Sequence, residues 1–220
     1  MPRLHRVDVG GNYYHVLNRA NARLQIFFNE DDYVLFEGIL EEACEIFQIE
    51  LLSYAVMPNH FHLVLKTQVD GSMGLFMKWL TQTHTSHWHK KNKTIGTGSL
   101  YQGRYKSFII QEDGHLFTVI RYVERNPLTA NLVQNLLNWQ YSSFWRREKG
   151  TNQQKKFLAS WPIDIPENYG MVLHQALSLK EIEKLEQSEE RSVPYGDEAY
   201  ILDTQEKYGI HIPTRVRSKK

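Results

Sequence analysis

The strongest constraint on the fold of this chain is a pair of strand-like runs in its first third. Residues 49–56 and 60–67 are rich in branched and aromatic side chains, and only Met57, Pro58 and Asn59 lie between them. Two strands with so short a connection pair as an antiparallel hairpin, because a parallel pair needs a much longer crossover. The sequence therefore predicts a sheet built around this hairpin.

Strand and helix signals alternate on both sides of the hairpin. A period of two predicts two more strands, and a period near 3.6 predicts helices. The strands are expected at 12–20 and 104–111, and the helices over about 18 residues from Asn29, over 71–92, and from Glu112 to near Pro127. This order predicts an α+β fold in which helices pack on a four-stranded antiparallel sheet, and we expect them to cover one face of it.

The composition becomes polar in the last third of the chain. Residues 149–156 read KGTNQQKK, a run typical of a boundary, and few apolar runs follow it. We therefore predict a main domain over 1–148 and a small, mainly helical extension over 149–220. The extension is expected to hold short helices at 178–191 and 196–208 and to end in a basic tail.

The net charge of +1 conceals an asymmetry along the chain. Residues 30–50 carry eight acids and no lysine or arginine, whereas residues 72–125 carry eight bases and three acids. The last seven residues, TRVRSKK, add four bases and no acid. A polyanion would meet these two basic segments, although the same charges also suit a solvated surface.

Composition excludes several classes of protein. The single cysteine, Cys44, has no second thiol with which to form an internal disulfide or a thiolate metal site. The sequence has no apolar run of about 18 residues, and its opening lacks the apolar core of a signal peptide. We expect a globular protein of the cytoplasm that does not associate with a membrane.

His60 and His62 lie two residues apart on the second strand of the hairpin. The side-chain period of a strand places both imidazoles on one face, where their ring nitrogens can chelate one metal ion. An isolated pair of this kind is more often structural. With a third ligand it would leave open positions for a substrate, as a catalytic metal requires.

The third helix carries a second candidate group. Tyr122 and Asn126 are four residues apart and share a helix face, so a phenol and an amide point the same way. The amide oxygen can bind a hard cation, and the phenol can act as a nucleophile. The plainer alternative makes Tyr122 a half-buried aromatic residue and Asn126 the end of the helix. Arg121 and Arg125 are also four apart, where they could contact a phosphate backbone.

Four segments in this order, YYHVLNRAN (13–21), MPNHFHLVL (57–65), GSLYQGRYKS (98–107) and RYVERNPLTANLV (121–133), closely resemble the REP-associated tyrosine transposases. These are a branch of the single-strand HUH transposases, whose catalytic domain has a ferredoxin-like fold. The resemblance is dense over residues 3–147 and looser through 191–200. The chain ends PTRVRSKK and lacks the Gly-Arg-Pro-Arg-Lys type of tail that is usual in the branch.

The resemblance implies roles for four residues. His60 and His62 match the paired histidines that bind the divalent ion, Mg²⁺ or Mn²⁺, and Asn126 falls at the position of the third ligand. Tyr122 falls on the nucleophile. The implied substrate is single-stranded DNA with hairpin structure, cut through a 5′-phosphotyrosine by an enzyme of the bacterial nucleoid that works as a monomer rather than a homodimer.

Further residues are expected to contact this DNA. The basic side chains of residues 72–125 would bind phosphates, and aromatic side chains would stack on unpaired nucleobases. The expected phosphate contacts are Lys90, Lys91, Lys93, Arg104, Lys106, Arg121 and Arg125, and the expected stacking residues are Trp88, Tyr101 and Tyr105.

Two other functions remain open from the sequence. One is a hydrolase in which His60, His62 and one of His84, His87 or His89 bind Zn²⁺ and activate water. The other is a DNA-binding protein without catalysis. Tyr101 and Tyr105 are also rival nucleophiles, although only Tyr122 has an amide four residues further along a helix.

Overall fold

A computed structural model describes residues 6–210. Four strands and eight α-helices make up this part of the chain, together with short 3₁₀ turns at Asn21–Arg23 and Leu136–Asn138. The first seven elements are β1 (Tyr13–Arg19), α1 (Glu30–Phe47), β2 (Glu50–Met57), β3 (His60–Lys66), α2 (Ser72–Asn92), β4 (Lys106–Ile110) and α3 (Gly114–Thr129). The remaining helices are α4 (Ser143–Lys149), α5 (Asn152–Lys156), α6 (Tyr169–His174), α7 (Leu179–Arg191) and α8 (Glu198–Tyr208).

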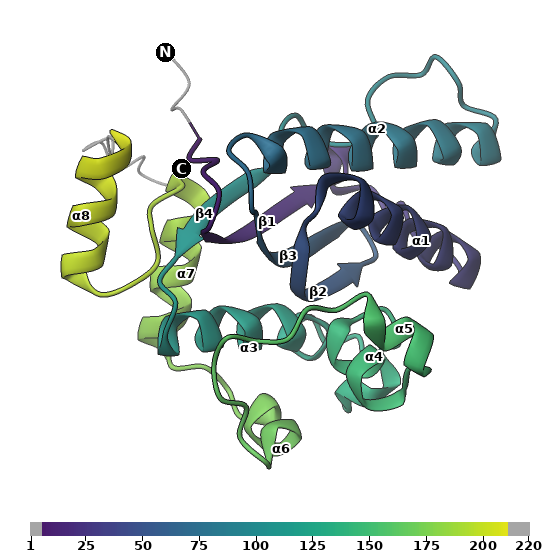
Figure 1. Ribbon diagram of the computed structural model, residues 1–220. Coiled ribbons are helices and arrows are strands. Elements are labelled where there is room, and N and C mark those ends of the chain that lie inside the picture. The colour runs from purple at the N-terminus through teal and green to yellow at the C-terminus, as the bar shows by residue number, and fades with distance from the viewer. Residues whose placement is uncertain (1–5, 211–220) are drawn as a thin grey trace, which may run out of the picture.

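The four strands form one antiparallel sheet in the order β2-β3-β1-β4 (Figure 1). β2 and β3 make the hairpin that the sequence predicts, with Met57 opposite His60. β1 lies in the middle of the sheet between β3 and β4, although it comes first in the chain. The predicted α+β fold is confirmed.

Helices cover both faces of the sheet, so the expectation of one covered face is wrong. α1 and α2 lie on one face, and α3 and α4 lie on the other (Figure 1). The cause is visible in β1, where Tyr14 and Val16 join the first hydrophobic cluster and Tyr13 joins the second. A sheet that is apolar on both sides must be covered on both.

α1 begins directly after Asn29, which caps its first turn. The Asn29 side chain accepts a hydrogen bond from the Asp32 amide, and Asp32 caps in return. Asp32 also forms an ion pair with Lys91 of α2 at 2.6 Å, which fastens the two helices together. Cys44 is buried on the inner side of α1, as expected of a small apolar residue.

α3 ends at Thr129, two residues beyond Pro127 and close to the predicted end of this helix. A proline cannot donate the backbone hydrogen bond that the Val123 carbonyl would otherwise accept. The Asn126 side-chain nitrogen lies 3.4 Å from that carbonyl oxygen and replaces the missing donor. The helix therefore tolerates proline in its last turn.

The extension packs closely on the α3 side of the sheet. Trp161 donates its indole hydrogen to the Leu52 carbonyl of β2, and Leu173 and Leu185 are buried in the second hydrophobic cluster. Helices α7 and α8 confirm the two predicted helices, whereas α5 and α6 were not predicted. The boundary at residue 148 stays a prediction, and the basic tail lies outside the described residues.

No helix within residues 6–210 is both long enough and apolar enough to cross a membrane.

A buried carboxylate joins α3 to the extension. Glu124 is fully buried and accepts hydrogen bonds from the Ser143 hydroxyl at 2.5 Å and the Tyr169 hydroxyl at 2.6 Å. Burial raises the pKa of Glu124, because the charged form loses its hydration.

We expect Glu124→Ala to lower the free energy of unfolding by about 2 kcal/mol, because it leaves the buried Tyr169 hydroxyl without its acceptor, whereas the Ser143 hydroxyl keeps the Tyr54 carbonyl at 3.2 Å. Urea denaturation followed by circular dichroism measures the change. The matched control is Glu148→Ala, which removes an exposed carboxylate from α4. Equal stabilities of the two variants would contradict the assignment.

Candidate active site

The paired histidines lie on the α3 side of the sheet. His60 and His62 project from β3, and their ring centroids are 5.0 Å apart. His62 is 2% exposed, whereas His60 is partly exposed at the end of the strand. The pair therefore has one buried member and one that faces the opening of the site.

A third histidine, which the sequence analysis did not single out, joins this pair. His15 of β1 is buried, and its Nε2 atom lies 2.9 Å from Nδ1 of His62. The period of two along β1 places His15 on the same face as Tyr13. The pairing of β1 with β3 could not be read from either segment alone, so the partnership with His62 was not predicted.

All three imidazoles are neutral at pH 7. Burial lowers the pKa of His15 to about 3 and that of His60 to about 4, and it lowers the pKa of His62 well below its usual range. Neutral imidazole is the form that binds metal ions.

Hydrogen bonds to the Nδ1 atoms orient the pair for ligation. His60 Nδ1 donates to the Asn59 side-chain oxygen at 2.6 Å, which leaves the lone pair on Nε2. When His62 Nδ1 donates to His15, the lone pair of His62 also lies on Nε2. Each ring then keeps a lone pair on Nε2, the atom with which it could bind a cation.

Tyr122 of α3 packs against these rings. Its ring centroid lies 5.9 Å from that of His62 and 6.1 Å from that of His15, in edge-on geometry. Burial raises the pKa of Tyr122, and the neighbouring Glu189 raises it further, so the phenol is protonated at neutral pH. The Tyr122 hydroxyl donates a hydrogen bond to Glu189 Oε2 at 3.4 Å.

Glu189 of α7 brings the extension into the site. Its carboxylate and the ring nitrogens of His15 and His62 all lie within 4.8 Å of one another, and no other such group of metal-binding side chains occurs within residues 6–210. Burial raises the pKa of Glu189. The sequence placed Glu189 on a helix but gave no signal of where that helix would pack.

Asn126 lies one turn further along α3 than Tyr122. Its side-chain nitrogen donates to the Tyr122 carbonyl at 2.9 Å, so its amide oxygen remains as the atom that could reach a cation. Its role as third ligand stays a prediction.

The two arginines of α3 bind the extension. Arg121 donates to the carbonyls of Val172 and Gln175, and Arg125 donates to those of Leu173 and His174. These contacts satisfy carbonyls at the C-terminal end of α6. Both guanidinium groups are thus engaged within the protein, and the phosphate contacts predicted for them would have to replace these bonds.

The three candidate stacking residues are all engaged as well. Tyr101 is 4% exposed and bonds through its hydroxyl to His84 Nδ1 at 2.6 Å, so its ring is not available to a base. The Trp88 indole donates to the Ile26 carbonyl, and the Arg6 guanidinium covers the Tyr105 ring at 4.0 Å. Tyr101 and Tyr105 pack in the cluster on the α1 and α2 side, whereas Tyr122 alone of the three tyrosines contacts the histidines.

The predicted lysine contacts differ in their surroundings. Lys90 and Lys93 are exposed at the end of α2, whereas Lys91 is paired with Asp32. Arg104 and Lys106 are exposed and line a recess at the end of β1. Their contacts with DNA stay predictions.

The zinc-hydrolase ligand set is not assembled. His84 bonds to Tyr101 on the α2 side of the sheet, and His89 bonds to Thr94 and the Gly98 carbonyl. His87 is exposed on α2. The sheet therefore separates His84 from His60 and His62.

Comparison with known proteins agrees with this geometry. A protein of Haemophilus influenzae that carries the name REP-associated tyrosine transposase is 23% identical over 151 residues, which cover 64% of this chain and 83% of the relative. A solved structure of a REP-associated tyrosine transposase bound to a REP hairpin has the same fold, with a TM-score of 0.57 at 16% identity, over 76% of this chain and 94% of the other.

The sequence model of the family described as "Transposase IS200 like" matches residues 8–126, a span that begins before β1 and ends at Asn126 of α3. It includes His15, His60, His62 and Tyr122, which the fold brings together. This chain belongs to the IS200-like transposase family.

Proposed function

We propose that this chain cuts and rejoins single-stranded DNA through Tyr122. The observation that carries the proposal is the packing of the Tyr122 ring against His62 and His15, within the group that His15, His62 and Glu189 form. A nucleophile beside neutral metal-binding imidazoles suits phosphoryl transfer.

The proposed chemistry conserves the phosphodiester. The Tyr122 oxygen attacks phosphorus, the bond from phosphorus to the 3′ oxygen breaks, and that oxygen leaves as a 3′-hydroxyl after gaining a proton. The phenolic proton must leave Tyr122, and the acceptor within hydrogen-bonding distance is Glu189. Rejoining reverses these steps and needs no ATP, because one ester has been exchanged for another.

The donor set fits a divalent cation such as Mg²⁺ or Mn²⁺. His60 and His62 supply neutral nitrogen, and Glu189 or Asn126 supplies oxygen. When bound, the cation supplies Lewis-acid stabilisation of the negative charge that develops on the phosphate. The residues of this chain hold the phosphate and the nucleophile in line.

The proposed substrate is a hairpin of the REP type with an unpaired flank. The relative of known structure was solved with a REP hairpin, and this chain shares its fold over 76% of its length. On that similarity and on the basic character of residues 72–125, we propose that this chain binds such DNA as a monomer.

We expect Tyr122→Phe to abolish a covalent protein–DNA adduct, because the substitution removes the hydroxyl of the tyrosine whose ring packs against His15 and His62. Hairpin oligonucleotides from repeats beside the gene, labelled at either end, are incubated with protein and Mn²⁺ and resolved on a denaturing protein gel. Only the fragment on the 3′ side of the break should remain on the protein. Tyr105→Phe is the matched control and should retain the adduct.

Two results would replace the proposal. Cleavage without an adduct that survives Tyr122→Phe would indicate hydrolysis by an activated water. Hairpin binding without any cleavage would indicate a DNA-binding protein that has no catalysis.

His15→Phe should weaken Mn²⁺ binding by roughly 10- to 100-fold, because His62 loses the partner that fixes its tautomer and orientation. Isothermal titration calorimetry of the full chain measures the affinity. His87→Phe removes an exposed histidine from α2 and should leave the affinity unchanged. If both variants bind Mn²⁺ like the parent protein, His15 has no part in the cation site.

A further inference from the structure

A basic recess lies beside the candidate active site, at the end of β1. Its volume is about 390 Å³, and its lining includes Arg19, Arg23, Gln102, Arg104 and Lys106. None of the ion pairs found within residues 6–210 involves these four cations. The recess therefore carries four positive charges that form no ion pair in this part of the chain.

The recess lies next to the histidine site on the same face of the sheet. Arg19 is paired across the strands with His60, so both side chains lie on the same face. The Arg19 charge is one of the causes that lower the pKa of His60 and oppose the rise in the pKa of Tyr122. A group held by Arg19 would thus be adjacent to the cation site and to the nucleophile.

Lys106 forms the other side of this connection. It pairs with Leu17, which places it on the same face of the sheet as Arg19. Its charge lowers the pKa of Glu189, against the larger effect of burial. Arg19 and Lys106 therefore both act electrostatically on Glu189, which bonds to Tyr122.

The loop before β4, which carries Gln102 and Arg104, is held by hydrogen bonds to the end of β1 and the residues that follow it. The Gln102 amide donates to the Arg19 carbonyl at 2.8 Å, and the Asn21 amide donates to the Leu100 carbonyl at 2.8 Å. The buried bond between Tyr101 and His84 anchors the same loop in the core. These bonds hold in place the loop from which the exposed side chains of Gln102 and Arg104 project.

We propose that this recess binds one unpaired nucleotide of the DNA strand, next to the phosphate that Tyr122 attacks. This inference rests on the proposed function. Arg19 and Lys106 contact the phosphate nearest the site, and Arg23 and Arg104 contact the next one. Gln102 offers an amide to the base edge.

Size and charge favour a single strand over a duplex. A recess of about 390 Å³ is at the lower end of small-ligand sites. A flexible strand can turn a phosphate and a base into such a recess, whereas the rigid convex surface of a double helix cannot enter it. Binding at this place would also keep the cut ends close enough to be rejoined.

The test measures binding by the full chain carrying Tyr122→Phe, so that no cleavage occurs. Fluorescence anisotropy follows a labelled 12-nucleotide oligothymidine and a labelled 12-base-pair duplex over a range of salt concentrations. The tested variant adds Arg23→Gln and Arg104→Gln, two exposed side chains whose loss should not affect folding.

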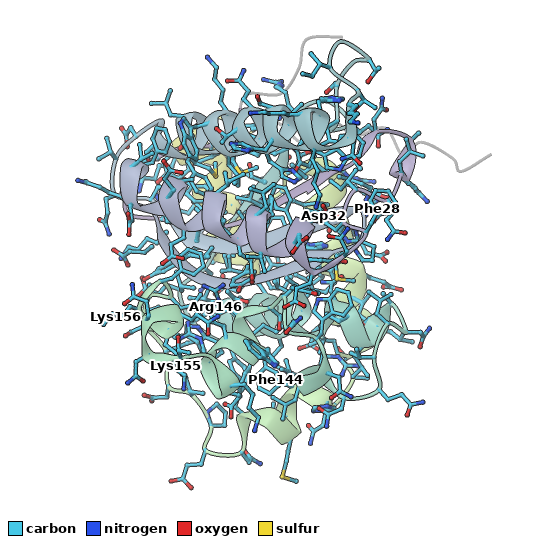
Figure 2. All side chains as sticks on the ribbon, turned by 90° about the vertical axis from the view of Figure 1, so that its right-hand side faces the viewer. Phe28, Asp32, Phe144, Arg146, Lys155 and Lys156 are labelled. Carbon is cyan, nitrogen blue, oxygen red and sulfur yellow. The ribbon has the colours of Figure 1, made fainter. Side chains whose placement is uncertain are left out.

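The matched control adds Lys155→Gln and Lys156→Gln, which removes the same charge from α5. Figure 2 shows Lys155 and Lys156 far from Phe28. Phe28 lies in the segment that follows Arg23 in the chain.

Loss of two phosphate contacts should lower the slope of log affinity against log salt by about 1.4 for the single strand and weaken its binding about tenfold near 0.1 M salt. The duplex and the lysine control should change much less. An unchanged slope for oligothymidine, an equal loss for the duplex, or no binding of oligothymidine by the Tyr122→Phe parent would overturn the proposal.

The adduct assay separates this inference from the function on which it rests. If the parent protein forms the adduct but the arginine variant binds oligothymidine normally, the recess proposal fails alone. If the arginine variant loses single-strand binding but no adduct ever forms, the transferase proposal fails alone.

Discussion

The antiparallel pairing of β1 with β3 is the constraint on which the candidate site depends. This pairing sets Leu17 opposite His62 and Arg19 opposite His60, and it brings His15 within hydrogen-bonding distance of His62. A slip of one residue would turn one set of these side chains to the other face, where α1 and α2 cover the sheet. The register of two central strands thus decides whether the histidines and Arg19 share a surface.

Polar contacts to the extension hold the helix that carries Tyr122. Arg121 and Arg125 bind carbonyls of α6 and the residue after it, and Glu124 binds Tyr169 at the start of α6. The same helix therefore carries Tyr122 of the active site and the side chains that bind the extension. The family match ends at Asn126, so the contacts made by α6 and α7 lie outside the part of the chain that identifies the family.

Local patterns predicted most of the elements, because a strand or helix shows its period within its own residues. The hairpin, α1 with its Asn29 cap, and the helices α7 and α8 lie where the sequence placed them. The covering of both faces was missed because the buried residues of β1 alternate between two apolar clusters.

The site was predicted only in part. Resemblance and spacing pointed to His60, His62 and Tyr122, whereas His15 and Glu189 join them through tertiary contacts that span 47 and 67 residues of chain. The burial of Tyr101 also depends on a tertiary contact, its bond to His84. The helix continues past Pro127 because the Asn126 side chain replaces the missing donor. Asn126 bonds to its own helix backbone, which a count of four residues from Tyr122 could not foresee.

The bond between Tyr122 and Glu189 has a consequence for the newly made chain. The two residues are 67 positions apart, and Glu189 is made last. At synthesis rates of about 5 to 20 residues per second, the ribosome needs roughly 3 to 13 s to add that length. Since N-terminal parts fold first, each nascent molecule passes through an interval in which the tyrosine has formed its contacts with the sheet but has no glutamate beside it. A message cut short before α7 would make that interval permanent.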